Sequence, residues 1–398
     1  MRDERRLATL AVHAGERGPR PDFTPVTTPI YHSVGYLYES MDDMDAVFGG
    51  EREGFVYPRY GSPTVSAFER AFAALEGAPE AVAFASGMAA VHAALLGAGV
   101  RAGATVVAAA DVYGATYALL DGTLRAMDVE TRFVDITQLA AVRDAVTEMR
   151  PVAVVCEAIS NPLLKVADVA QLAAIAHDAG AALIVDSTFA TPYLLRPLAH
   201  GVDYVVHSAT KYIGGHGDVM AGIVACDADR AGDLRDRQKL LGANLGPQEA
   251  WMALRGIKTL VLRVREQFSS AQVVAHWLAA HPRVERVYYP GLPTHPQYPL
   301  ATDLYGARGY GGMVTMVLRD AGRDDVLRFM ERLRLVLPAT TLGDVQSLCL
   351  YPAMSSHRAV APEVRAALGI TDGLVRLSIG IEDVQDIIAD LEQALEPA

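Results

Sequence analysis

Two segments carry the strongest information about the fold: residues 181–190, AALIVDSTFA, and residues 204–218, YVVHSATKYIGGHGD. Each begins with a short apolar run and then becomes polar. Asp186 ends the first run, and Lys211 follows the second run among hydroxyl-bearing residues. Such uninterrupted apolar runs are typical of strands in a parallel sheet covered on both faces. Ligands bind at the carboxyl ends of these strands, so we expect Asp186 and Lys211 to reach one pocket.

The sequence on both sides of these segments shows the same kind of pattern. Apolar runs and amphipathic helical stretches alternate, which predicts an α/β fold with a mostly parallel sheet and helices on both faces. The further predicted strands are 105–110, 132–134, 152–156 and 222–226, and the clearest helices are 139–149 and 168–179. Beyond about residue 256 the pattern is that of a smaller α+β domain, with strands at 284–288, 312–318 and 374–379 and helices at 264–281, 323–333 and 383–395.

The first sixty residues have a different composition. Prolines are frequent there and aromatic residues are scattered, so we expect an extended arm that lies against a neighbouring subunit. The predicted organisation is therefore an N-terminal arm at 1–60, a large domain at 61–255 and a C-terminal α+β domain at 256–398.

Composition limits the possible functions. The 398 residues are 51% hydrophobic, which is enough for large buried cores, and the net charge of −12 argues against binding to nucleic acid or to an anionic membrane. Residues 81–100 contain no charged residue, but they are rich in alanine and are predicted to be buried helix rather than a membrane span. The three distant cysteines indicate a reducing compartment, and the N-terminus has no signal-peptide core, so we expect a cytoplasmic protein.

Four local motifs suggest chemistry when they are read together. Lys211 could form a Schiff base with pyridoxal 5′-phosphate (PLP), and Asp186 could face the pyridine nitrogen of that cofactor. The Ser86–Gly87 turn opens a helix that could hold a phosphate, and Tyr113 could stack on the cofactor ring. Each motif alone has a plainer explanation: a surface lysine, a turn-capping aspartate, a tight helix start and a packed aromatic residue.

In combination, these motifs resemble the Cys/Met-metabolism family of PLP-dependent enzymes. The resemblance spans the chain in order and spacing. It is carried by YPRYGSPT at 57–64, SGM at 86–88, VYG at 112–114, DSTFATP at 186–192, SATKYIGGHGD at 208–218, RGIKTL at 255–260, TLGD at 341–344 and DGLVRLS at 372–378. It implies the PLP-dependent, aspartate-aminotransferase-like fold, known as fold type I, with PLP as the cofactor.

The resemblance also implies roles for individual residues. Lys211, Tyr113 and Asp186 would be catalytic, with Asp186 paired to the cofactor ring nitrogen and Tyr113 stacked on the ring. The remaining cofactor-binding residues would be Ser86, Gly87, Met88, Asn161, Ser208 and Thr210, joined by Tyr57 and Arg59 from a neighbouring subunit. Asn161, Thr341, Leu342 and Arg376 would hold the substrate, with Arg376 clamping its carboxylate. A homotetramer built as a dimer of dimers is the expected assembly.

The predicted reaction is γ-elimination from L-methionine, or a related γ-thio amino acid, to 2-oxobutyrate, ammonia and a thiol. GGHGD at 214–218 and Thr340 favour methionine, because cystathionine enzymes tend to carry glutamate at the position of Thr340. Ala115 and the Gln238–Lys239 pair depart from methionine γ-lyases. The alternatives are cystathionine γ-lyase or γ-synthase, then O-acylhomoserine sulfhydrylase, and finally a non-catalytic scaffold.

Other charged groups give weaker signals. His177, His200 and His207 lack metal-ligand spacing, so no metal site is predicted. Arg263 and Arg265 are expected to be ordinary solvated charges.

Overall fold

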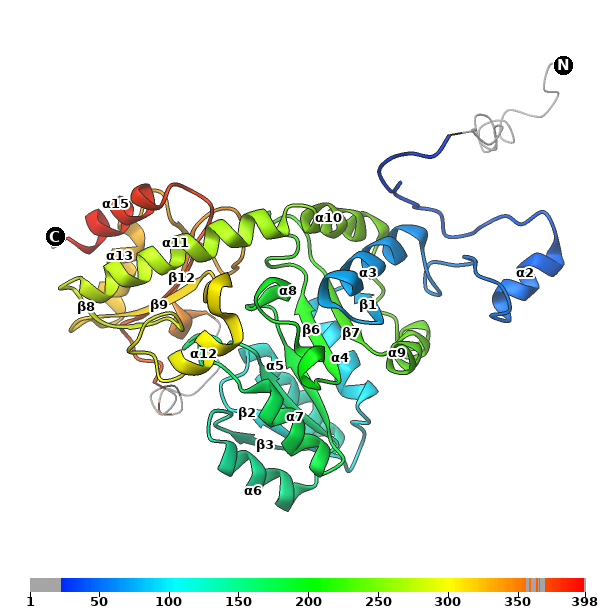
Figure 1. Cartoon of the computed structure of the whole chain (residues 1–398), viewed down its shortest axis with the longest axis horizontal. Coiled ribbons are helices and arrows are strands. Elements are labelled where there is room, and N and C mark those ends of the chain that lie inside the picture. Colours follow the sequence, from blue (N-terminus) through cyan, green and yellow to red (C-terminus); the bar gives the residue numbers. More distant parts are fainter. Residues whose placement is uncertain (1–22, 356–357, 359–362, 364, 366–368, 397–398) are drawn as a thin grey trace.

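The computed structural model describes residues 23–398 except 356–357, 359–362, 364, 366–368 and 397–398. Two sheets organise these residues, a large one built from the first two thirds of the chain and a small one built from the last third (Figure 1). This arrangement confirms the predicted α/β fold with a smaller C-terminal α+β part. The exact domain limits stay a prediction, because α11 (Leu260–Ala280) contributes side chains to the cores of both parts.

The large sheet has the strand order β1-β7-β6-β5-β4-β2-β3. Neighbours from β6 to β3 run parallel, whereas β7 is antiparallel to both β6 and β1. The carboxyl ends of the parallel strands therefore meet at one edge, as the apolar runs predicted. The strands are β1 (Glu80–Phe84), β2 (Thr105–Ala109), β3 (Glu130–Val134), β4 (Ala153–Glu157), β5 (Ala182–Asp186), β6 (Tyr204–Ser208) and β7 (Gly222–Cys226).

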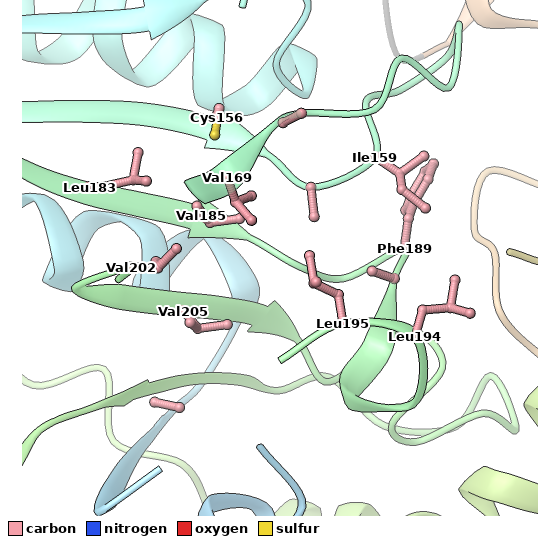
Figure 2. Close-up of a cluster of buried hydrophobic side chains, with 14 of the residues drawn as sticks. Cys156, Ile159, Val169, Leu183, Val185, Phe189, Leu194, Leu195, Val202 and Val205 are labelled. Atoms are coloured by element: carbon pink, nitrogen blue, oxygen red, sulfur yellow. The ribbon is translucent and has the colours of Figure 1, made fainter. Parts of the chain in front are cut away.

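Helices cover both faces of this sheet. One face packs against α3 (Pro63–Glu76), α6 (Leu139–Met149), α7 (Val169–Asp178) and α10 (Pro247–Ile257). The other face packs against α4 (Gly87–Gly97) and α9 (Ala228–Leu241). Figure 2 shows part of the first core, where Leu183 and Val185 of β5 and Val205 of β6 lie near Val169 of α7. Burial on both faces explains why these strands lack the alternating polar residues of a half-exposed sheet.

The uncharged stretch at 81–100 forms β1 and α4. The predicted buried helix is confirmed for α4, which packs in the core on the second face of the sheet. It is wrong for residues 81–84, which form the strand β1 with side chains buried on both faces of the sheet. Ser86 begins α4 by accepting a hydrogen bond from the Ala89 amide at 3.1 Å. In the part of the chain that the structure describes, no helix has the length and apolar character needed to cross a membrane.

The small sheet has the order β10-β11-β12-β9-β8 and is mostly antiparallel. It consists of β8 (Val284–Tyr288), β9 (Met313–Leu318), β10 (Leu337–Pro338), β11 (Leu348–Leu350) and β12 (Leu374–Ser378). The helices α11, α13 (Arg323–Arg332) and α15 (Val384–Leu395) enclose its core (Figure 1). The shorter helices are α5 (Gly114–Ala118), α8 (Thr191–Leu194) and α12 (Tyr298–Tyr305).

The described part of the N-terminal arm leads away from the body of the molecule (Figure 1). It is not extended throughout, because residues Met41–Phe48 form the helix α2 with Ser40 as its N-cap. The sequence MDDMDAVF places two acidic residues in the first turn, where the helix dipole favours them. The prediction of a wholly extended arm is therefore wrong at this helix.

Candidate active site

The carboxyl edge of the large sheet and the loops of the small sheet enclose a cavity of about 500 Å³. Eleven predicted residues line it: Ser86, Gly87, Met88, Tyr113, Asn161, Asp186, Ser208, Thr210, Lys211, Leu342 and Arg376. Thr341 contacts this set through Lys211, whose Nζ donates a hydrogen bond to the Thr341 hydroxyl at 2.9 Å. Residues more than 250 positions apart are therefore brought into a single site.

Lys211 lies in the turn after β6 and reaches across the cavity to the small sheet. Burial and the neighbouring guanidinium of Arg376 lower the pKa of Lys211 below its usual value. A lower pKa increases the fraction of neutral amine, which is the form that can attack an aldehyde or accept a proton. The plainer explanation of Lys211 as a surface lysine is thereby excluded.

Asp186 ends β5 beneath the same cavity. Its Oδ1 accepts a hydrogen bond from the Thr188 amide at 2.9 Å, and burial raises the pKa of its carboxyl group. The Thr188 hydroxyl in turn accepts a hydrogen bond from the Ser208 amide at 2.8 Å, which ties β5 to β6 at the cavity. A buried carboxyl in this position suits a cationic partner such as a protonated ring nitrogen.

The start of α4 also lines the cavity, next to the end of β6. The first amides of a helix have no partner inside the helix, so Gly87 and Met88 can offer N–H groups to an anion. Gly87 is packed so closely on Ser208 that a β-carbon there would lie 2.8 Å from the Ser208 β-carbon. The Thr210 hydroxyl is 3.0 Å from the Ala221 amide, whose hydrogen bond it accepts. Together these groups form a small polar cradle whose N–H and hydroxyl donors suit a phosphate.

Arg376 is held in β12 and is only 3% exposed. Its Nη1 donates to Asn161 Oδ1 at 2.9 Å and its Nη2 donates to the Thr341 carbonyl oxygen at 3.3 Å. Burial lowers the pKa of Arg376 to about 10, so the group stays positively charged at neutral pH. A guanidinium has five N–H donors, so these two described hydrogen bonds leave other N–H groups free to bind a carboxylate.

Two predicted cofactor ligands lie elsewhere in this chain. Tyr57 and Arg59 are in the arm and are absent from the described cavity lining. The guanidinium of Arg59 lies over the rings of Tyr57 and Tyr60 and donates to the Lys239 carbonyl oxygen at 2.7 Å. Their predicted contact with a cofactor therefore stays a prediction that requires a second subunit.

Arg263 corrects one prediction, because it is buried rather than solvated. Its guanidinium donates to the carbonyl oxygens of Tyr212 and Gly256 at 2.8 and 2.9 Å, so α11 holds the turn that follows Lys211. Burial lowers its pKa to about 10. Gly215 is required beside it, because a β-carbon there would lie 1.9 Å from Arg263 Nη1. Arg265, in contrast, is exposed as expected.

Sequence reasoning missed several lining residues, including Glu157, Thr188, Leu350 and Ser355. Glu157 had the same signal as Asp186, since both are carboxylates at the end of an apolar strand. Thr188 could have been found from its place directly after Asp186. Leu350 and Ser355 had no local signal, because they reach the cavity only through the folding of the small sheet.

Comparison with known proteins identifies the family. Residues 8–396 match the model of the Cys/Met metabolism PLP-dependent enzymes. L-methionine gamma-lyase of Fusobacterium nucleatum subsp. nucleatum is 41% identical over 393 residues, covering 98% of each chain. O-succinylhomoserine sulfhydrylase of Pseudomonas aeruginosa is 40% identical over 387 residues, covering 97% of this chain and 94% of its own.

A solved structure agrees with these sequence matches. Cystathionine gamma synthase of Xanthomonas oryzae pv. oryzae superimposes with a TM-score of 0.87 at 37% identity, covering 93% of this chain and 92% of its own. The chain therefore belongs to the Cys/Met-metabolism family of PLP-dependent enzymes. The predicted fold type, the PLP cofactor and the class of PLP-dependent carbon–sulfur lyases are confirmed.

The residues present fit PLP. The cavity combines an amine with a lowered pKa, a buried carboxyl group and an anion cradle at a helix start. These are the groups required for the aldehyde, the ring nitrogen and the phosphate of this cofactor, respectively. The plainer explanations of the four motifs and the scaffold alternative do not account for their convergence in a single cavity.

Proposed function

We propose that this enzyme catalyses γ-elimination from L-methionine or a related γ-thio amino acid. For methionine, the balanced reaction consumes one water and yields 2-oxobutyrate, ammonia and methanethiol. The relatives at about 40% identity carry different activities in their names, so overall identity does not select among them. The choice therefore depends on the chemistry of the cavity.

The charges in the cavity lining carry the proposal. The charged residues among its described lining are Glu157, Asp186, Lys211 and Arg376. Asp186 and Lys211 face the cofactor, Arg376 suits the substrate carboxylate, and Glu157 accepts hydrogen bonds from backbone amides. Among the described lining residues, no charged side chain is left for the second amino-acid group of cystathionine.

The rest of the described lining suits an uncharged thioether. It includes Met220, Thr340, Leu342, Leu350 and Ser355, which offer apolar surface and two hydroxyl groups. Burial of a methylthio group against such side chains is favourable, whereas burial of an unpaired ammonium or carboxylate is costly. This contrast favours methionine over cystathionine.

The side chains of the site have distinct tasks in the proposed reaction. Bound PLP withdraws electrons from the substrate α-carbon and so makes its proton acidic. Lys211, whose lowered pKa provides a neutral amine, accepts that proton at Nζ. Arg376 holds the carboxylate and thereby orients the α-carbon toward Lys211. In this proposal Tyr113, which lines the cavity, donates a proton to the departing thiolate sulfur.

We further propose that the active assembly is a homo-oligomer, most simply a dimer of dimers. The arm leads away from the body (Figure 1) and exposes apolar side chains that a second copy could cover. These include Phe23, Val34, Leu37, Met41 and Phe48. Tyr57 and Arg59 lie on the same arm, which supports their delivery to the cavity of a neighbouring subunit.

A direct comparison of substrates tests the proposed reaction. Purified holoenzyme is incubated separately with L-methionine, cystathionine, homocysteine and O-succinylhomoserine, the last with and without added sulfide. We expect the highest kcat/KM for 2-oxobutyrate release with methionine, together with an equal amount of methanethiol. Higher kcat/KM with cystathionine would favour the transsulfuration alternatives. Sulfide-dependent consumption of O-succinylhomoserine without 2-oxobutyrate would favour the sulfhydrylase alternative.

A further inference from the structure

Glu157 is a buried carboxylate at the cavity that the proposed reaction leaves without a task. It is the last residue of β4 and is 9% exposed. In the parallel pairing of β4 with β5 it lies opposite Asp186. It forms no ion pair with a lysine or arginine in the described ranges of the chain, so its burial needs another explanation.

The two oxygens of Glu157 accept hydrogen bonds from two separate segments. Oε1 accepts from the Tyr113 amide at 2.7 Å, and Oε2 accepts from the Asn161 amide at 3.0 Å. Tyr113 directly precedes α5, whereas Asn161 lies in the loop after β4. The carboxylate therefore joins two backbone segments that are 48 residues apart in sequence at one wall of the cavity.

Both segments lead to groups that face the reaction. Tyr113 lines the cavity, and Asn161 Oδ1 accepts a hydrogen bond from Arg376 Nη1 at 2.9 Å. Arg376 also donates a hydrogen bond to the Thr341 carbonyl oxygen, and the Thr341 hydroxyl accepts a hydrogen bond from the Lys211 amine. A displacement of Glu157 would therefore shift the groups that face the cofactor and those that hold the substrate carboxylate.

The geometry requires a carboxylate of this length. Two backbone N–H donors need two acceptor oxygens, and the carboxyl group of glutamate provides both. Glutamine provides one acceptor and would direct its own N–H group at the second donor. Aspartate keeps two acceptors but is one methylene shorter, so we expect it to lose at least one of these two contacts.

Burial of a carboxyl group at this position is electrostatically unfavourable. Burial and the nearby charge of Asp186 raise the pKa of Glu157 well above its usual range, while the two amide donors act in the opposite direction. Two carboxyl groups side by side under a binding cavity are unfavourable for stability alone. Such a cost is typical of residues retained for the geometry of a site.

We propose that Glu157 is a positioning residue that fixes Tyr113 and Asn161, and through Asn161 also Arg376, in the geometry needed for catalysis. The inference rests on the proposed function for the roles of Tyr113 and Arg376. Glu157 does not touch the reacting atoms. Its substitution should therefore alter the environment of bound PLP and both kinetic constants without removing the cofactor.

The test compares the holoenzymes of the wild type, Glu157→Gln and Asp390→Asn. Asp390 is a matched control, because this buried carboxylate also accepts backbone N–H bonds, from Arg334, Leu335 and Val336, but it lies in the C-terminal part away from the cavity. The readouts are visible circular dichroism per bound PLP, the thermal midpoint, and kcat and KM for the best substrate. The spectroscopic readout does not depend on which substrate is the true one.

For Glu157→Gln we expect a weaker visible dichroic band at full PLP occupancy and a fall in kcat of up to about 100-fold. KM should rise by about 10-fold, because Asn161 no longer holds Arg376 in line. Asp390→Asn should lower the thermal midpoint and leave the dichroic band, kcat and KM unchanged.

A Glu157→Gln enzyme with an unchanged dichroic band and unchanged kinetic constants would overturn the proposal, whatever its thermal midpoint. Glu157→Asp provides the same test if the glutamine variant does not fold, and it too must show the weaker band and lower kcat. Failure of methionine as a substrate would count against the proposed function alone, since the dichroic test would still stand.

Discussion

Replacement of Arg376 by lysine tests whether this residue holds the substrate carboxylate. Arg376 is 3% exposed, and its guanidinium uses two of its N–H donors for hydrogen bonds to Asn161 and Thr341. The donors that remain can approach both oxygens of a carboxylate, whereas a lysine ammonium offers a single point of contact. Loss of one charge-assisted hydrogen bond costs about 1.5–3 kcal/mol.

This energy corresponds to a rise of about 10- to 150-fold in the dissociation constant for a ligand with a carboxylate. Binding is measured with L-norleucine and with L-norleucinamide, through the change that each causes in the visible absorbance of bound PLP. The norleucine constant should rise by the stated factor in Arg376→Lys, and the amide constant should change little. In turnover, KM should rise by a similar factor while kcat changes less.

Arg263→Lys is the matched control for this experiment. Arg263 is also a buried guanidinium with its pKa lowered to about 10, but its described bonds go to the turn after Lys211 and to the end of α10. Its substitution should leave the ratio of norleucine to norleucinamide binding as in the wild type. Equal weakening of both ligands in Arg376→Lys, or loss of the PLP absorbance band, would show that Arg376 is structural and refute the reasoning.

Three further outcomes are expected. Lys211→Ala should lose the visible absorbance of covalently held PLP and all measurable turnover, and retention of that band would exclude Lys211 as the attachment site. Arg59→Ala mixed with Lys211→Ala should regain activity through hybrid dimers, and no recovery after verified subunit exchange would contradict a shared site. Burial lowers the pKa of His295 from 6.5 to about 4 in the folded protein. As the pH falls, the unfolded chain therefore takes up a proton before the folded protein does. The free energy of unfolding, measured with urea, should therefore lose about 3 kcal/mol as the pH falls from 6.5 to 4, and His295→Gln should flatten this dependence.

The strands of the large sheet could be predicted well from local pattern. The apolar runs at 152–156, 181–186 and 204–207 correspond to β4, β5 and β6 within about one residue, because strands buried on both faces must be apolar throughout. The antiparallel direction of β7 and the existence of α2 were not predicted. Strand direction depends on the connection and pairing of neighbours, and the apolar run of β7 resembles those of its parallel neighbours.

The sequence alone was sufficient for the chemistry of the cofactor. Asp186 and Lys211 follow the neighbouring parallel strands β5 and β6, and the carboxyl ends of parallel strands meet at one edge of a sheet. The Gly87 helix start follows β1 at the edge of the same sheet. Their residue types and order then pointed to PLP, and the family confirmed it.

The substrate side of the site was decided by the tertiary structure. Arg376 meets Asn161 across 215 residues, and Lys211 meets Thr341 across 130 residues, because the small sheet packs over the edge of the large one. Contacts between distant segments also bury Arg263, which local sequence placed in solvent, and bring the carboxyl group of Glu157 to the amide of Tyr113. The local sequence pattern indicates which face of a helix or strand is apolar. The partner of a buried polar group is decided only when distant segments of the chain pack together.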